Sequence, residues 1–92
     1  GEDGHTASLF PDLEYPQDAL VVPVHDAPKP PPDRVSLGVK ALADTDDLLF
    51  LVTGGGKRDA VRSWRGDEPI PANTIATRGR TEILVDRAAW PE

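Results

Sequence analysis

An apolar run that leads into a glycine-rich turn constrains this fold more than any other feature of the chain. Residues 48–52 (Leu-Leu-Phe-Leu-Val) have the length of a strand, and Thr-Gly-Gly-Gly-Lys follows at 53–57. In the next segment, 58–65, apolar residues recur at helical spacing. A strand, a glycine turn and a helix in this order are typical of α/β folds with parallel strands. We therefore predict that 48–52 is a buried, central strand of a parallel sheet.

The remaining patterns complete an α/β prediction. Pro23 places the first predicted strand at a sheet edge, because proline donates no hydrogen bond to a neighbouring strand. A proline-rich stretch, 27–33, predicts an extended connection to the next strand. We expect a layered fold with a mainly parallel sheet. The other predicted strands are 19–24, 34–39 and 81–86, and the other predicted helical turns are 40–44, 71–75 and 87–90.

Charge and composition exclude several classes of function. Ten basic and sixteen acidic residues give a net charge of −6, which argues against a nucleic-acid partner. The absence of cysteine excludes disulfides and thiolate chemistry and fits a reducing compartment. No apolar run is long enough to span a membrane, and no set of ligands predicts a catalytic metal. At 92 residues, the chain is expected to form a single domain at most.

The first eleven residues are the main candidate for a reactive site. They contain two carboxylates, two glycines, two hydroxyl side chains and one of only two histidines, and they end at Pro11. Gly4 provides backbone freedom just before His5. Residues 6–10 are expected to form a short helix that stops at Pro11, which would place His5 near a helix N-terminus. Histidine accepts and returns protons near neutral pH, so this segment predicts chemistry on a carbonyl or a phosphate ester.

The glycine turn at 54–57 is the second candidate element. Backbone N–H groups between a strand and a helix can bind an anion, and Lys57 adds a positive charge. The match to known phosphate loops is partial, because Leu51 stands where a Walker loop needs glycine and Arg58 where it needs a hydroxyl. From these residues alone, an anion site and an ordinary tight turn with an exposed lysine both stay open.

The opening sequence Gly-Glu-Asp-Gly-His-Thr-Ala-Ser-Leu-Phe-Pro resembles the signature of the 6-phosphogluconolactonases, hydrolases of the oxidative pentose phosphate pathway. Glucosamine-6-phosphate deaminase/isomerases have a related Asp-Gly-His motif but continue differently, so the chain resembles them less. Later segments resemble the lactonase pattern in the same order. They are the prolines before Arg34, the glycines before Lys57, Pro71-Ala72, and Asp-x-Ala-Ala at 86–89.

The resemblance implies a role for each candidate residue. It implies hydrolysis of 6-phospho-D-glucono-1,5-lactone in the cytoplasm, without a cofactor. His5 would be the catalytic base and Asp3 would orient it. Arg34 and Lys57 would contact the substrate phosphate, and the neighbouring Gly4 and Thr6 would bind substrate.

The same resemblance implies that residues 1–92 are the C-terminal portion of a lactonase-like domain. Such enzymes carry an upstream Gly-Gly-Ser/Thr loop and an Asp-Glu-Arg segment, which this sequence does not contain. We therefore expect the missing N-terminal half to be a partner and the isolated chain to be weakly active or inactive. Two alternatives stay open: a sugar-phosphate deaminase/isomerase on the same scaffold, and a non-catalytic phosphosugar-binding module or inactive fragment.

Overall fold

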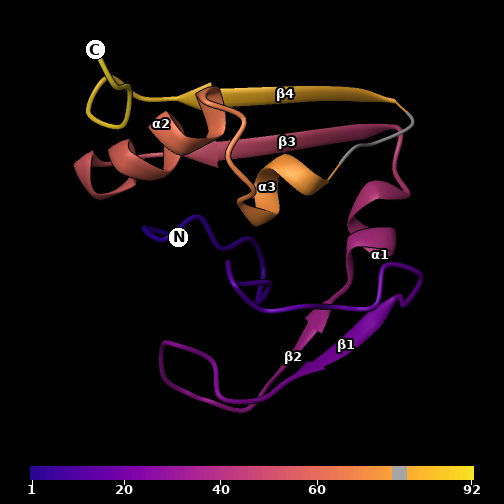
Figure 1. Cartoon of the computed structure of the whole chain (residues 1–92). Coiled ribbons are helices and arrows are strands. Elements are labelled where there is room, and N and C mark those ends of the chain that lie inside the picture. Colours follow the sequence, from indigo (N-terminus) through magenta and orange to yellow (C-terminus); the bar gives the residue numbers. More distant parts are fainter. Residues whose placement is uncertain (76–78) are drawn as a thin grey trace.

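The computed structural model describes residues 1–75 and 79–92 and has the expected α/β class. Figure 1 shows two groups of elements, with the N-terminal segment running between them. One group is built on β3 and β4 and the other on β1 and β2. The strands are β1 (Val21–Val24), β2 (Arg34–Leu37), β3 (Asp47–Val52) and β4 (Arg80–Val85), and the helices are α1 (Val39–Ala43), the 3₁₀ turn η1 (Gly55–Lys57), α2 (Arg58–Arg65) and α3 (Pro71–Thr74).

The predicted strand–turn–helix unit is present. β3 and β4 pair in parallel, from Asp47 opposite Arg80 to Val52 opposite Val85. The helix α2 lies between them in the sequence and packs its apolar side against β3. The rings of Phe50 and Trp64 meet edge to face, with their centroids 4.8 Å apart. Parallel strands need such a crossover connection, so the 48–65 pattern was an accurate guide to topology.

β1 and β2 form a separate antiparallel ribbon. Pro23 lies in β1 of this two-stranded sheet, as a strand-edge proline should. Val22 and Val24 alternate with exposed residues and point into the core, where they meet Leu9 and Phe10 of the N-terminal segment. The main core cluster therefore joins the candidate reactive segment to the ribbon.

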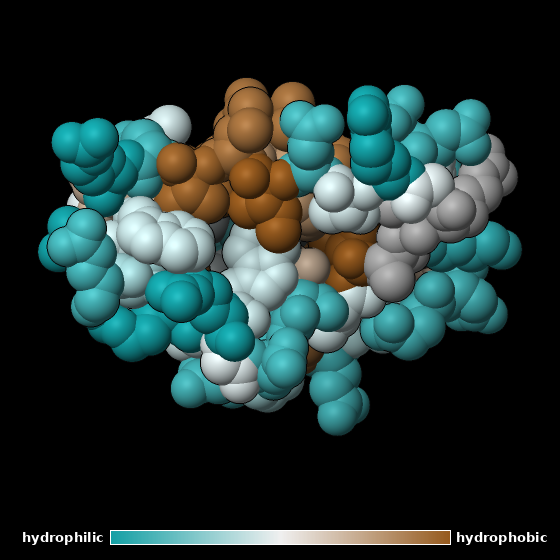
Figure 2. All heavy atoms as spheres, turned by 90° about the horizontal axis from the view of Figure 1, so that it is seen from above, coloured by the Kyte–Doolittle hydropathy of each residue, from teal (hydrophilic) through white to brown (hydrophobic). Residues whose placement is uncertain are grey.

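The prediction that 48–52 is a buried, central strand is wrong. Leu49 and Leu51 of β3 are 53% and 71% exposed. Within the described residues β3 has β4 as its only strand partner, and α2 covers only part of it. Figure 2, which views the molecule from the β4 side, shows an uncovered area of apolar side chains. A strand is buried only when layers cover both of its faces, and its own sequence cannot supply them.

The helix predictions for residues 6–10 and 87–90 are also wrong, because both segments form turns. Thr6 and Leu9 pair as an antiparallel bridge around a tight turn, in which Ala7 has a positive φ of 53°. Residues 87–90 likewise form a turn. Segments this short gain little from helical hydrogen bonds, so tertiary contacts decide their conformation. In the first segment, the Leu9 and Phe10 side chains are fully buried in the core cluster with Val22 and Val24. None of the helices in the described ranges has the length and apolar character needed to cross a bilayer.

Candidate active site

The loop that carries His5 depends on glycine at position 4. Gly4 has a φ of +90°, a conformation that residues with side chains rarely adopt. A Cβ at this position would lie 3.1 Å from side-chain atoms of the buried Ile70. Gly4 therefore turns the chain and lets it pass close to Ile70, which sets the start of the reactive segment.

Asp3 holds His5 through two contacts. Its Oδ1 accepts the His5 backbone N–H at 3.0 Å and lies 2.6 Å from His5 Nδ1. Burial alone would raise the pKa of Asp3. The hydrogen bonds from the backbone and imidazole of His5, together with attraction to the imidazole charge, outweigh burial and lower the pKa of Asp3. Asp3 and His5 are thus in direct contact, and the carboxylate is stabilised in its ionised form.

The backbone amides near His5 are largely used within the loop. The His5 N–H donates to Asp3, and the Thr6 N–H donates to Leu9 O at 3.1 Å. The expected helix N-terminus is absent here, because residues 6–10 form a turn. Among residues 5–7, the Ala7 N–H is the amide that these contacts do not engage.

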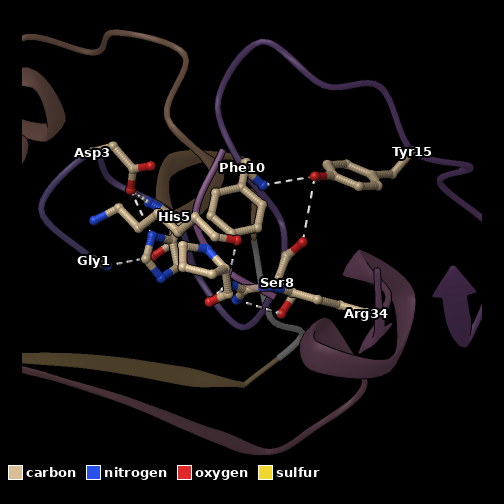
Figure 3. Close-up of polar contacts among 9 residues, drawn as sticks. Gly1, Asp3, His5, Ser8, Phe10, Tyr15 and Arg34 are labelled. Atoms are coloured by element: carbon tan, nitrogen blue, oxygen red, sulfur yellow. Dashed lines mark hydrogen bonds and ion pairs between the residues drawn. The ribbon is translucent and has the colours of Figure 1, made fainter. Parts of the chain in front are cut away.

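His5 and Arg34 contact the same aromatic ring. The His5 and Phe10 ring centroids are 4.7 Å apart with a 34° angle between the planes, and the Arg34 guanidinium carbon is 5.1 Å from the Phe10 centroid. Figure 3 shows the imidazole beside the Phe10 ring. Phe10 is 1% exposed, and its backbone N–H donates to the Tyr15 hydroxyl at 2.8 Å.

Arg34 uses much of its hydrogen-bonding capacity inside the protein. Nε donates to Pro31 O at 2.9 Å, and Nη2 donates to the carbonyls of Lys29 and Pro30, each at 2.9 Å. Nη1 donates to Ser8 Oγ at 3.4 Å. A guanidinium has five N–H bonds, and these four contacts use four of them. The side chain thus anchors the proline-rich loop next to the His5 segment.

The glycine turn binds an anion that belongs to the chain itself. Gly54, with a φ of +93°, donates its N–H to the carboxylate of Asp86 at 3.1 and 3.2 Å. Asp86 follows β4, and Oδ1 also accepts the Ala89 N–H at 2.9 Å. Lys57 stands at the end of this turn, directly before α2. Its backbone N–H donates to Gly54 O at 3.1 Å, and its ammonium group gives the turn a positive charge.

One cavity brings together four of the six predicted site residues. It has a volume of about 200 Å³, and its walls are formed by the N-terminal loop, β3, α2, Ile70 and Ala72. The predicted residues among its lining are Gly4, His5, Thr6 and Lys57. Neither Asp3 nor Arg34 lines the cavity. Asp3 contacts the imidazole of His5, which does line it. The arrangement combines a carboxylate-bound imidazole, a lysine and an apolar wall.

A second cavity of about 390 Å³ contains none of the predicted residues. Its lining includes the carboxylates of Asp12 and Glu14, which would repel a phosphate. Within residues 1–75 and 79–92, no three histidine, aspartate or glutamate side chains gather as a metal site would require.

Sequence reasoning missed the residues that support the site. Contacts within the His5 loop and between the loop and β2 involve Phe10, Tyr15 and Ser36. Ser36, 5% exposed, accepts the Ser8 N–H on its hydroxyl at 3.0 Å. In β2 the apolar Val35 and Leu37 are exposed and the polar Ser36 faces inward, and no local pattern shows that its hydroxyl meets a backbone group 28 residues away.

Comparison with known proteins gives one family. Residues 1–85 match the profile of a family described as glucosamine-6-phosphate isomerases/6-phosphogluconolactonase. Among curated proteins, the chain is 49% identical to a probable 6-phosphogluconolactonase of Schizosaccharomyces pombe and 38% identical to the 6-phosphogluconolactonase of Homo sapiens. Each alignment covers 97% of this chain and 37% of the relative.

Solved structures agree with this result. The fold matches the crystal structure of 6-phosphogluconolactonase from Thermotoga maritima with a TM-score of 0.78 and 30% identity, over 92% of this chain and 39% of that one. It matches the Trypanosoma brucei enzyme with a TM-score of 0.79 and 25% identity, over 97% of this chain and 38% of that one. The chain thus spans less than two fifths of the length of these relatives.

Proposed function

Since the chain belongs to the family of glucosamine-6-phosphate isomerases and 6-phosphogluconolactonases, we propose that it carries the base and one phosphate contact of a 6-phosphogluconolactonase. The substrate is 6-phospho-D-glucono-1,5-lactone and the product is 6-phosphogluconate. The observation that supports this most directly is the cavity shared by His5 and Lys57, with Asp3 bound to the imidazole. A base and a cation at one site fit an ester that carries a phosphate.

His5 is the proposed base. With Nδ1–H donated to the Asp3 carboxylate, Nε2 holds the lone pair that accepts a proton from water. The hydroxide attacks the lactone carbonyl, and a tetrahedral oxyanion forms. When the ring C–O bond breaks, the imidazolium returns its proton to the leaving alkoxide. Asp3 stabilises the charged imidazole and keeps it in one tautomer throughout this cycle.

Lys57 is the proposed phosphate-binding group, because its ammonium is a point charge suited to phosphate oxygens. Gly4 and Thr6 line the same cavity and would border the sugar. A phosphate contact from Arg34 stays a prediction from the resemblance, and the internal contacts of its guanidinium support another role, argued below.

The activity is proposed to need a further part of the same domain. The chain spans 37% of the length of its curated relatives, and apolar residues of β3 and β4 such as Leu51 and Leu84 are 71% and 52% exposed. A strand with this composition is usually covered on both faces. We propose that an N-terminal half covers it and supplies other substrate contacts, and that the assembled protein works in the cytoplasm, where phosphorylated metabolites are turned over.

The test is a lactonase assay on a fusion in which the N-terminal part of the Schizosaccharomyces pombe relative precedes this chain. We expect hydrolysis well above the rate in buffer, and a loss of about 10²-fold or more in kcat for His5→Ala. The matched control is His25→Ala, since His25 is the other histidine and its side chain is 74% exposed. A fusion that hydrolyses no lactone, or a fully active His5→Ala variant, would overturn the proposal. Release of ammonia from glucosamine 6-phosphate by the same fusion would favour the deaminase alternative.

A further inference from the structure

The buried ring of Phe10 contacts two side chains of the candidate site. The imidazole of His5 lies 4.7 Å from the ring centroid, and the guanidinium of Arg34 lies 5.1 Å from it. Both are groups for which the face of an aromatic ring is a favourable neighbour. The ring therefore provides a contact between Arg34 and His5 that does not involve substrate.

Packing and hydrogen bonds hold Phe10 in place, so its ring can fix the position of the side chains that contact it. Its side chain belongs to the core cluster with Leu9, Val22 and Val24. On the backbone side, the Tyr15 hydroxyl accepts the Phe10 N–H at 2.8 Å and donates to Ser8 O at 3.4 Å, as the dashed lines in Figure 3 mark. Close packing leaves a ring in such a core few alternative positions.

Arg34 is anchored on its other side. Three carbonyl oxygens, from Lys29, Pro30 and Pro31, accept its Nε and Nη2 hydrogens at 2.9 Å each. These contacts leave little of the planar fork for a bidentate phosphate contact. Arg34 also does not line the cavity that contains His5 and Lys57.

Resting on the proposed function, we infer that Arg34 and Phe10 are positioning residues for His5, and that Arg34 does not bind the substrate phosphate. Asp3 fixes one ring nitrogen of His5, which still allows the imidazole plane to swing about that contact. The Phe10 face removes this freedom, and Arg34 holds the ring and the loop beside it. Together the contacts direct Nε2, and small errors in the direction of a base are costly to the reaction.

Kinetics with two substrates separates positioning from phosphate binding. The fusion protein and its variants are assayed on 6-phosphogluconolactone and on gluconolactone, which lacks the phosphate. Lys57→Gln should raise KM for the phosphorylated lactone only. Arg34→Gln should lower kcat for both lactones by a similar factor, roughly tenfold or more, with little change in KM. An Arg34→Gln variant that raises KM for the phosphorylated lactone alone, or changes neither parameter, overturns the inference.

A spectroscopic readout is independent of activity. Ring protons of His5 next to the Phe10 face should show a ring-current shift in the NMR spectrum, and the exposed His25 is the internal reference. Phe10→Leu and Arg34→Gln should both move the His5 signals and leave those of His25 in place. Leu9→Ala is the control for lost packing, because Leu9 is equally buried in the same cluster but does not belong to the stack.

These measurements keep the two proposals apart. If the wild-type fusion has no lactonase activity, the proposed function fails and the NMR comparison alone judges the positioning role. His5 signals that stay unchanged in Arg34→Gln and Phe10→Leu would overturn that role. A Leu9→Ala variant that loses as much kcat as Phe10→Leu at equal stability would overturn it as well, since the loss would then be one of packing.

Discussion

The carboxylate of Asp86 accepts the backbone N–H of Gly54 at 3.1 and 3.2 Å, although 32 residues separate the two in the chain. The contact joins the segments that follow β3 and β4, where parallel strands end at the same edge of the sheet. A glycine turn of this kind invites an anion, and here the protein provides one. The Gly54 amide is thus a structural contact, and Lys57 is the cationic side chain of the turn.

Asp86→Ala should destabilise the fusion protein. The substitution removes the acceptor for the N–H groups of Gly54 and Ala89, and lost hydrogen bonds of this kind cost on the order of 1 kcal/mol each. Urea denaturation measures the change. Asp33→Ala, which removes the exposed contact with His25, is the control and should give no measurable change. Equal effects from the two substitutions would show that the Gly54 contact is not formed.

Gly4→Ala should unfold or displace the His5 loop. The φ of +90° costs a residue with a side chain roughly 1–2 kcal/mol, and the new Cβ would press on Ile70. Gly66→Ala is the matched control, because Gly66 has a φ of −85° and its nearest neighbour would lie 3.5 Å from an added Cβ. Thermal denaturation of both variants checks the difference. A Gly4→Ala protein as stable as the Gly66→Ala protein would contradict the loop conformation.

Asp3→Asn should lower kcat by about 10² or more, since a neutral amide holds the imidazole tautomer poorly and does not stabilise its charge. The measurement is steady-state hydrolysis of 6-phosphogluconolactone by the fusion, with circular dichroism to confirm folding. An Asp3→Asn enzyme with unchanged kcat would remove Asp3 from the proposed mechanism.

The same carboxylate should make stability depend on pH in acid. The folded-state pKa of Asp3 is below its ordinary value of 3.8. Its stabilising contribution is therefore fully present above pH 3.8 and is lost as the pH falls through the folded-state pKa. The difference in unfolding free energy between wild type and Asp3→Asn should shrink as the pH is lowered below 3.8. Urea titrations at a series of acidic pH values measure it, and a difference that persists at the lowest pH would disprove the linkage.

Local patterns were enough for most of the secondary structure. The apolar run before the glycines predicted β3, and the helical spacing after them predicted α2. Pro23 marked an edge strand, and the apolar, β-branched residues around it predicted β1. These features depend on neighbours in sequence, which is why they can be read from it. Short segments without a strong pattern, 6–10 and 87–90, were assigned wrongly because contacts elsewhere decide them.

The sequence by itself determined the α/β class, the family signature and the chemical types at the site: a histidine, a carboxylate two residues before it, and a lysine after a glycine turn. Only the tertiary structure decided which of these groups meet. It placed His5 and Lys57 on one cavity, turned Arg34 toward carbonyls and Phe10, and used Asp86 to bind the Gly54 amide. The physical reason is distance along the chain. Propensities and turn preferences act over a few residues, whereas these contacts join segments that come together only when side chains pack.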